Sequence, residues 1–319
     1  MGDVVLVTGS TAIDHTGFYD GSFEDYEEQY PVTAFNASFQ LGGMRTSFGG
    51  CAPNIAYGLN LLGIKGIPLS SAGRNFRDHY EAHLTSNGID TRFIFIDDDV
   101  AYCASCLMIN DEEGNQVIGF YPGPHDPKRQ LPSELPIINE VRLANLGPEE
   151  PHLTLKQARD LAALGIPMVA DPGQVTASFS RKDIRELLEL VDALIVNEHE
   201  LDVLLSNGGL DQQALMAKVP ELVVTQSEQG VDVYRDGACT HVSAVPDVEI
   251  VEVTGCGDAF RAGYIYGMLN NLGIRERAEI GCVMAAINLA CEETQRYRTS
   301  IDEVLQTQER VYRIRPEVS

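Results

Sequence analysis

The chain lacks the long apolar run that a membrane span needs. No stretch of about 18 consecutive apolar residues occurs, which is the least that would indicate a spanning helix. The first residues, MGDVVLVTG, also lack the basic and apolar regions of a secretory signal peptide and predict a buried strand instead. We therefore expect a cytoplasmic protein with no membrane partner.

Basic residues are scarce. Lysine and arginine together number 23 against 47 acidic residues, which gives a formal net charge of −24. Such a surface repels phosphate backbones, so nucleic acid is not an expected partner. Two explanations of the acidity stay open, namely solubility alone and adaptation to high salt.

The seven cysteines lack the spacing of a disulfide framework, and their odd number favours reduced thiols. Cys103 and Cys106 form a C-x-x-C pair, but neither a second pair nor a histidine cluster completes a zinc site. We expect small core residues here and keep a metal or redox protein as the alternative.

Strand-like and helix-like segments alternate along most of the chain. The apolar periodicity predicts strands at 4–9, 67–73, 166–173, 193–200 and 221–230, and helices at 53–63, 76–88, 152–165, 181–191, 257–272 and about 276–292. This alternation predicts one α/β domain over residues 1–319, with a doubly wound, mostly parallel sheet that helices cover on both faces.

Two segments interrupt the alternation. Residues 13–47 are polar and aromatic, and residues 92–121 contain two strand-like runs around a DEEGN turn. Together they predict a small antiparallel β lid inserted into the α/β body. A standing sheet has a free face and free edges, so a homodimer formed through the lid is a further expectation.

Polar residues follow several predicted strands, at the edge where open parallel sheets bind ligands. In TGCGD, the glycines around Cys256 allow backbone N–H groups to converge at a helix N-terminus, which suits a phosphate or a developing anion. Asp258 has two interpretations, a helix cap or a base that takes a proton from an attacking hydroxyl. The motif is neither a Rossmann fingerprint nor a Walker A loop.

The other polar clusters suggest partners for this site. Asn197, Glu200 and Glu228 could supply oxygen ligands to hydrated Mg²⁺ and phosphates, while an ordinary loop acid stays open for Glu228. Gly49 and Gly50 open a helix in which Asn54 could bind a sugar hydroxyl. Asp14 could accept hydrogen bonds from a vicinal diol, and a structural turn is the alternative.

In this order, GSTAID, SFGGCAPNIAYGLNLLG, NEHE and VTGCGDAFRAG resemble the PfkB, or ribokinase-like, family of sugar and nucleoside kinases over nearly the whole chain. GFYPG and ADPGQ are similar to the prokaryotic adenosine kinase branch. The resemblance implies that Asp258 is the catalytic base and that Gly255, Cys256 and Gly257 form an anion hole. It places Asn197 and Glu200 in the Mg²⁺–phosphate region. It implies nucleotide contacts from the loop Thr225 to Gly230, with Ser227 and Glu228, and from Asn288.

The sequence departs from the family pattern at several positions, and these departures affect which properties of the family are expected of this chain. Glu252 stands where the family usually has Asp, at a position that helps to hold a monovalent cation in some members, so a cation stays an open cofactor. Cys256 replaces the common Ala and Ser227 a common Gly.

We therefore predict an ATP- and Mg²⁺-dependent kinase that phosphorylates the 5′-hydroxyl of a nucleoside, with adenosine as the first choice. Phe120 would contact the base, or would be lid core. A ribokinase-type sugar kinase and a catalytically silent family member are the alternatives. The sequence leaves the acceptor undecided.

Overall fold

The computed structural model describes residues 3–25, 38–124 and 129–313. Within them, one large sheet has nine strands in the order β13-β12-β11-β10-β9-β8-β1-β4-β5. Neighbours from β11 to β5 are parallel, and β12 and β13 extend one edge as antiparallel strands. The strands are β1 (Val4–Thr8), β4 (Lys65–Gly73), β5 (Ile94–Asp97), β8 (Val141–Leu146), β9 (Met168–Ala170), β10 (Ala193–Asn197), β11 (Glu221–Thr225), β12 (Val231–Arg235) and β13 (Ala238–Val242).

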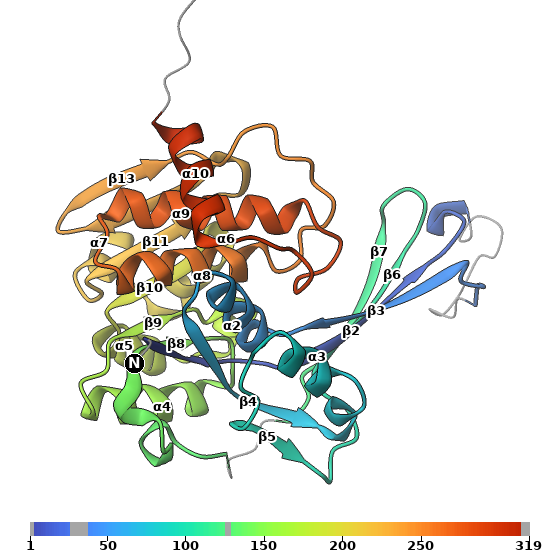
Figure 1. The fold of residues 1–319 in the computed structure, drawn as a ribbon, viewed down its shortest axis with the longest axis horizontal. Helices are drawn as coiled ribbons and strands as arrows, with labels where there is room; N and C mark the ends of the chain where they lie inside the picture. Colours follow the sequence, from blue (N-terminus) through green and yellow to red (C-terminus); the bar gives the residue numbers. More distant parts are fainter. Residues whose placement is uncertain (1–2, 26–37, 125–128, 314–319) are drawn as a thin grey trace, which may run out of the picture.

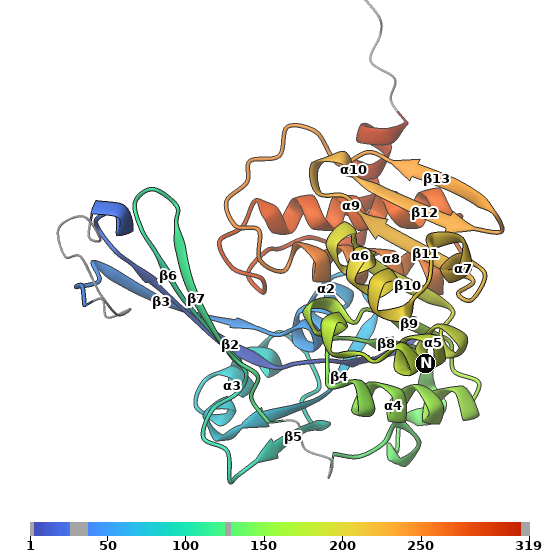
Figure 2. The ribbon, with the colours of Figure 1, turned by 180° about the vertical axis from the view of Figure 1, so that it is seen from behind.

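Helices cover both faces of this sheet (Figures 1 and 2). One apolar core contains Val5 and Val7 of β1 with residues of α2, α3, α8, α9 and α10, and the other contains Val4 and Leu6 with residues of α4 to α7. Because successive strand residues point to opposite faces, this division shows a sheet buried on both sides and confirms the predicted doubly wound class. The helices are α2 (Cys51–Leu61), α3 (Tyr80–Ser86), α4 (Pro151–Ala163), α5 (Arg181–Leu190), α6 (Glu198–Gly208), α7 (Gln212–Met216), α8 (Cys256–Leu269), α9 (Ile274–Leu289) and α10 (Ile301–Tyr312).

A second, four-stranded sheet extends away from the body as the lid (Figure 1). Its strands are β2 (Ala12–Phe18), β3 (Gly43–Gly49), β6 (Ser105–Asn110) and β7 (Gln116–Tyr121), in the order β3-β2-β6-β7. Both hairpins are antiparallel, and the central β2–β6 pair that joins them is parallel. The predicted DEEGN turn closes the second hairpin, where Asp111 Oδ1 accepts from the N–H groups of Glu113 and Asn115. Part of the predicted lid segment 13–47 lies outside the described residues.

Several predicted boundaries were wrong. The strand predicted over 221–230 ends at Thr225, and the strand predicted over 166–173 is limited to Met168–Ala170. The lid segment was expected to begin at residue 92, but β5 pairs in parallel with β4 at the edge of the main sheet. The periodicity of a segment indicates that it forms a strand, but it does not indicate which strand it pairs with. The strand predicted over 193–200 ends at Asn197, because Asn197 and Glu200 cap the N-terminus of α6.

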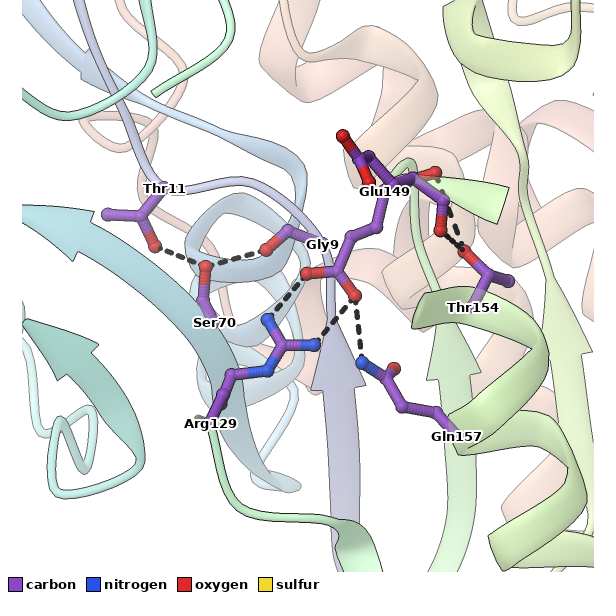
Figure 3. A network of polar contacts seen from close by, with 8 residues as sticks. Gly9, Thr11, Ser70, Arg129, Glu149, Thr154 and Gln157 are labelled. Atoms are coloured by element: carbon purple, nitrogen blue, oxygen red, sulfur yellow. Dashed lines mark hydrogen bonds and ion pairs between the residues drawn. The ribbon is translucent and has the colours of Figure 1, made fainter. Parts of the chain in front are cut away.

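The chain that returns from the lid is anchored in the body by a buried ion pair (Figure 3). Arg129 donates from Nη1 and Nη2 to the two carboxylate oxygens of Glu149, at 2.5 and 2.8 Å, and Gln157 adds a third donor at 3.1 Å. Both charged side chains are under 5% exposed. Beside them, Thr11 donates to Ser70, which donates to the carbonyl of Gly9 after β1. None of the described helices is long and apolar enough to cross a membrane.

Candidate active site

The N-terminus of α8 forms a backbone nest at the edge of the body. Gly255 is the N-cap residue with φ 77°, a left-handed conformation that favours glycine. A Cβ there would also come within 2.5 Å of Thr294 Cγ2. The helix then begins at Cys256, so the N–H groups of its first turn lack helical acceptors and carry the positive end of the helix dipole. This arrangement suits an anion.

Asp258 lies in that first turn and is 9% exposed. Its Oδ2 accepts from Asn54 Nδ2 of α2 at 2.8 Å. Burial raises the pKa of Asp258, while the guanidinium of Arg261 and hydrogen bonds from Asn54 and the Cys51 thiol oppose the rise. The carboxylate is thus held by donors from two helices, in a position to accept a proton.

Asn54 is itself held by residues that sequence reasoning missed. Gln295 Nε2 donates to Asn54 Oδ1 at 2.8 Å and to Tyr80 Oη at 2.7 Å, and Tyr80 donates to the carbonyl of Gly49 at 2.6 Å. With Oδ1 occupied in this way, the amide nitrogen of Asn54 faces Asp258. Nothing in the local sequence around Gln295 indicates this contact.

Asp14 lies on the lid face that meets the body. Its Oδ1 accepts from the backbone N–H of Cys106 at 2.8 Å, and a Cβ at Gly49 would come within 2.7 Å of its Oδ2. Burial raises the pKa of Asp14, and Cys106 and His15 oppose the rise. Strand register aligns Asp14, Cys106 and Phe120 across one face of the lid, and the Phe120 side chain is 54% exposed there.

A pocket lies between this lid face and two loops of the body, lined by Asp14 and Met108 on one side and Thr294 on the other. At its rim, Arg45 of β3 forms an ion pair with Glu252, with 3.3 Å between Nη2 and Oε2. The other carboxylate oxygen of Glu252 accepts from the N–H groups of Val253 and Thr254. The lid therefore contacts the loop that leads into the nest.

Asn197 and Glu200 form the capping box of α6. Asn197 Oδ1 accepts from the N–H of Glu200 at 2.8 Å, and Glu200 Oε2 accepts from the N–H of Asn197 at 2.9 Å. Burial raises the pKa of Asp171 to about 7; the guanidinium of Arg261 opposes this rise, and the nearby charge of Glu200 adds to it. Glu200 is therefore close to the Asp258 side of the sheet edge, although its side chain also serves the helix.

The loop after β11 lies at the same edge as the α6 cap. Asn197 and Thr225 are register partners on β10 and β11. Ser227 adopts φ 50°, and Glu228 is exposed. A Cβ at Gly230 would come within 2.1 Å of the Val242 carbonyl.

Asn288, from α9, is 1% exposed and stands 3.7 Å from the Cβ position of Gly255. Its buried Oδ1 has no hydrogen-bond partner in the described part of the chain.

The cysteine alternative finds little support in the geometry. Cys103 is buried, and burial raises the pKa of its thiol to about 11. Across residues 3–25, 38–124 and 129–313, no group of three or more His, Cys, Asp or Glu side chains is arranged to hold a metal.

Comparison with known proteins bears on the family and the fold. The pfkB family carbohydrate kinase model matches residues 3–300. A nucleoside kinase of Methanothermobacter thermautotrophicus is 27% identical over 286 residues, which cover 89% of this chain and 90% of that protein. An ATP-dependent ribose-1-phosphate kinase of Halopiger xanaduensis is 25% identical and covers 78% of this chain and 82% of its own. The solved structure of the Burkholderia thailandensis nucleoside kinase in complex with inosine has a TM-score of 0.84 at 26% identity, covering 98% of this chain and 100% of that one.

Proposed function

Because the chain belongs to the pfkB family of carbohydrate kinases and is an ATP-dependent kinase of a hydroxyl group, we propose that it phosphorylates the 5′-hydroxyl of a nucleoside. Adenosine is the acceptor that GFYPG and ADPGQ favour. Inosine is the nucleoside bound to the B. thailandensis relative, so it stands beside adenosine as a first acceptor to test.

The observation that carries this proposal is a buried carboxylate beside a backbone nest. Asp258 accepts the proton of the attacking hydroxyl, and the N–H groups around Gly255, Cys256 and Gly257 stabilise charge on the transferred phosphoryl group. As the new oxygen–phosphorus bond forms, the bond to the departing ADP oxygen breaks. Catalysis is then mainly positioning and electrostatics.

The lid would hold the sugar and the base. Asp14, which lines the pocket, accepts hydrogen bonds from the ribose hydroxyls, with Gly49 and Gly50 nearby. Asn54 contacts the sugar and also donates to Asp258. Phe120 presents an exposed ring on the same lid face, which suits contact with a nucleobase. A sugar alone would leave that ring without a partner.

ATP and Mg²⁺ would bind on the other side of the nest. Thr225, Ser227, Glu228, Gly230 and Asn288 are proposed to line the nucleotide, with Asn197 beside its phosphates. Glu200 would hold Mg²⁺ through water, which fits an ion that keeps several waters and needs few protein carboxylates. Bound there, Mg²⁺ would neutralise charge on the phosphates.

A monovalent cation at Glu252 would compete with partners that the carboxylate already has. That carboxylate is already engaged by Arg45 and by backbone donors. We propose that the Arg45 guanidinium supplies the positive charge at this position.

A kinase of a free or phosphorylated sugar is the second candidate, and the similarity to the ribose-1-phosphate kinase of H. xanaduensis favours it. It would use the same Asp258 and nest. A catalytically silent protein is disfavoured because both features are intact.

The test is ADP release from ATP–Mg²⁺, at low and at molar salt. Acceptors are adenosine, inosine, guanosine, cytidine, ribose, fructose and fructose phosphate. Turnover confined to nucleosides, and absent with 5′-deoxyadenosine, supports the proposal. Turnover on sugars alone assigns the protein to the second candidate, and no turnover with any acceptor removes both.

The lid face opposite Asp14 exposes Met44, Leu107, Val117 and Tyr121. A homodimer formed through this face remains a proposal, as does the single domain over residues 1–319. Light scattering of the purified protein measures the former, and a single cooperative unfolding transition would support the latter.

A further inference from the structure

Arg261 lies one helical turn after Asp258 on α8, with its side chain 9% exposed. Helical side chains lean toward the N-terminus, and this one reaches back to the nest. A Cβ on Gly257 would come within 2.5 Å of Arg261 Nη1, so the guanidinium occupies the space that a side chain at 257 would need. The D-x-F-x-x-G pattern leaves this position free, and it assigns Arg261 no role.

Asp171 holds the guanidinium from the opposite side. Nη2 donates to Asp171 Oδ1 at 2.6 Å, and Nε lies 2.5 Å from Oδ2. Asp171 directly follows β9, at the carboxyl edge of the sheet. The pair therefore joins a strand end to the helix that carries the nest, through one hydrogen bond and one close ionic contact.

Further titratable groups surround the pair on several elements. Asp258 shares α8 with Arg261, Glu200 faces it from α6, and the Cys51 thiol faces it from α2. Around Asp258 itself, the neighbours are Arg261, Asn54 and Cys51, with the Tyr80 and Tyr297 phenols also within its electrostatic reach. Arg261 is the one cation among these groups.

Stability does not explain this placement. The positive end of the α8 dipole disfavours a cation in the first turns of the helix. Burial removes both charges of the pair from water, and a buried ion pair is weak support for the folded state. A helix N-terminus with an added buried cation does, however, concentrate positive potential where an anion would develop.

We propose that Arg261, held by Asp171, is a positioning residue for phosphoryl transfer. It stabilises the nest conformation at Gly257 and keeps Asp258 ionised and aimed at the acceptor hydroxyl. This inference rests on the proposed kinase function and deepens it. It holds for a nucleoside or a sugar acceptor alike, because both use the same nest.

The role follows from the charge balance of the step. The acceptor hydroxyl loses its proton to Asp258 while its oxygen forms the bond to the γ-phosphorus, and ADP departs with the electron pair of the broken bond. Asp258 must therefore start ionised in a buried site, and Arg261 favours that state. Negative charge spread over the phosphoryl oxygens then meets the same positive potential.

The experiment compares Arg261→Lys and Arg261→Gln with a matched control, Arg129→Lys, at the buried pair with Glu149 (Figure 3). Each variant is first checked for folding by circular dichroism and thermal melting. We expect Arg261→Lys to lower kcat about 10- to 100-fold, less than the roughly 10²- to 10³-fold loss of an oxyanion donor because the positive charge is retained. The KM values for ATP and acceptor should change little. Arg129→Lys should leave kcat unchanged in the folded fraction.

Two further measurements, the pH profile and the affinity for an aluminium fluoride complex, should not change if the role of Arg261 is merely structural. With Arg261→Gln, the acidic limb of the kcat/KM profile should shift to higher pH, because the pKa of Asp258 loses an opposing charge. Binding of ADP–Mg²⁺ with aluminium fluoride should weaken, while binding of ADP–Mg²⁺ alone is kept. Asp171→Asn retains the cation but loosens it, so kcat and aluminium fluoride affinity should fall by less. Because this variant removes a negative charge near Asp258, its acidic limb should not move to higher pH.

Folded Arg261 variants with unchanged kcat, pH limb and aluminium fluoride affinity would overturn the inference. If Arg261→Gln does not fold, Arg261→Lys and Asp171→Asn carry the test. A wild type that turns over no acceptor would defeat the proposed function. The fluoride-complex measurement needs no turnover, so it judges Arg261 separately.

Discussion

Two buried arginine–carboxylate pairs have nearly the same chemistry and different surroundings. Arg129 with Glu149 anchors the chain returning from the lid, and Arg261 with Asp171 lies against the nest. In the first pair, Glu149 also accepts a hydrogen bond from the neutral side chain of Gln157. The second is within electrostatic reach of Glu200 and Asp258. A buried ion pair thus says little about its role until its neighbours are known.

The largest expected effect tests the site beside the second pair. Asp258→Asn should lower kcat/KM about 10²- to 10⁴-fold, because the general base is lost while the side-chain volume stays. Thermal stability should be kept, and that is checked by melting. ADP release at saturating ATP measures the activity, and near wild-type turnover would mean that another group takes the proton.

An effect of nearly equal size, but on stability, is expected at the first pair. Arg129→Met leaves the Glu149 carboxylate buried without its cation and should lower the free energy of unfolding by about 3–5 kcal/mol. Urea denaturation measures this loss. The folded fraction should retain wild-type kcat, and a specific loss of kcat would erase the distinction between the two pairs.

A smaller effect should appear when the partner of Asp258 on α2 is removed. Asn54→Leu deletes a donor that opposes the raised pKa of Asp258, so that pKa should rise further. Asp258 acts when ionised, and its activity is lost as pH falls through the pKa, so the acidic limb of kcat/KM should move to higher pH. At alkaline pH, Asp258 is ionised in both proteins. The remaining fall in kcat/KM should then correspond to about 1.5–3 kcal/mol of lost transition-state stabilisation, typical of a hydrogen bond to a charged group.

Gln295→Leu is the companion variant, because it leaves Asn54 in place and removes only its support. It should also move the acidic limb of kcat/KM to higher pH, but by less than Asn54→Leu does. An unmoved limb in both variants would contradict the placement of Asn54 as a donor to the base.

The smallest effect concerns a third pair, between lid and body. Arg45 and Glu252 are partly exposed, with 30% and 25% of their side chains accessible, so the pair should contribute about 0.2–1 kcal/mol. Arg45→Ala should raise the acceptor KM up to about fivefold at low salt, and the difference should shrink at high salt. Arg92→Ala, at an exposed pair with Asp90 outside the lid, is the control and should leave KM unchanged.

Much of the fold could be predicted because its signals are local. The doubly wound sheet follows from apolar runs and helical spacing, and the DEEGN turn is set by one aspartate that accepts from residues two and four positions later. Strand β8 and helix α6 were missed. The polar Arg142 and Asn145 interrupt the run in β8, and NEHE conceals a helix start at the end of a strand.

Helix α10 and the antiparallel edge strands β12 and β13 were also absent from the prediction. Short strands of mixed polarity, such as ACTHV in β13, carry little periodic signal. Their place at the sheet edge depends on pairing with β11 and with each other rather than on their own composition.

By itself, the sequence determined the nest and the residue beside it, since TGCGD holds a left-handed glycine, a helix start and Asp258 within a few positions. Only the tertiary structure decided what surrounds Asp258. Arg45 meets Glu252 across 207 residues, Asn54 meets Asp258 across 204, and Arg261 meets Asp171 across 90. Local backbone preferences act over a few residues, whereas these contacts exist only because packing brings distant elements together at one edge of the sheet.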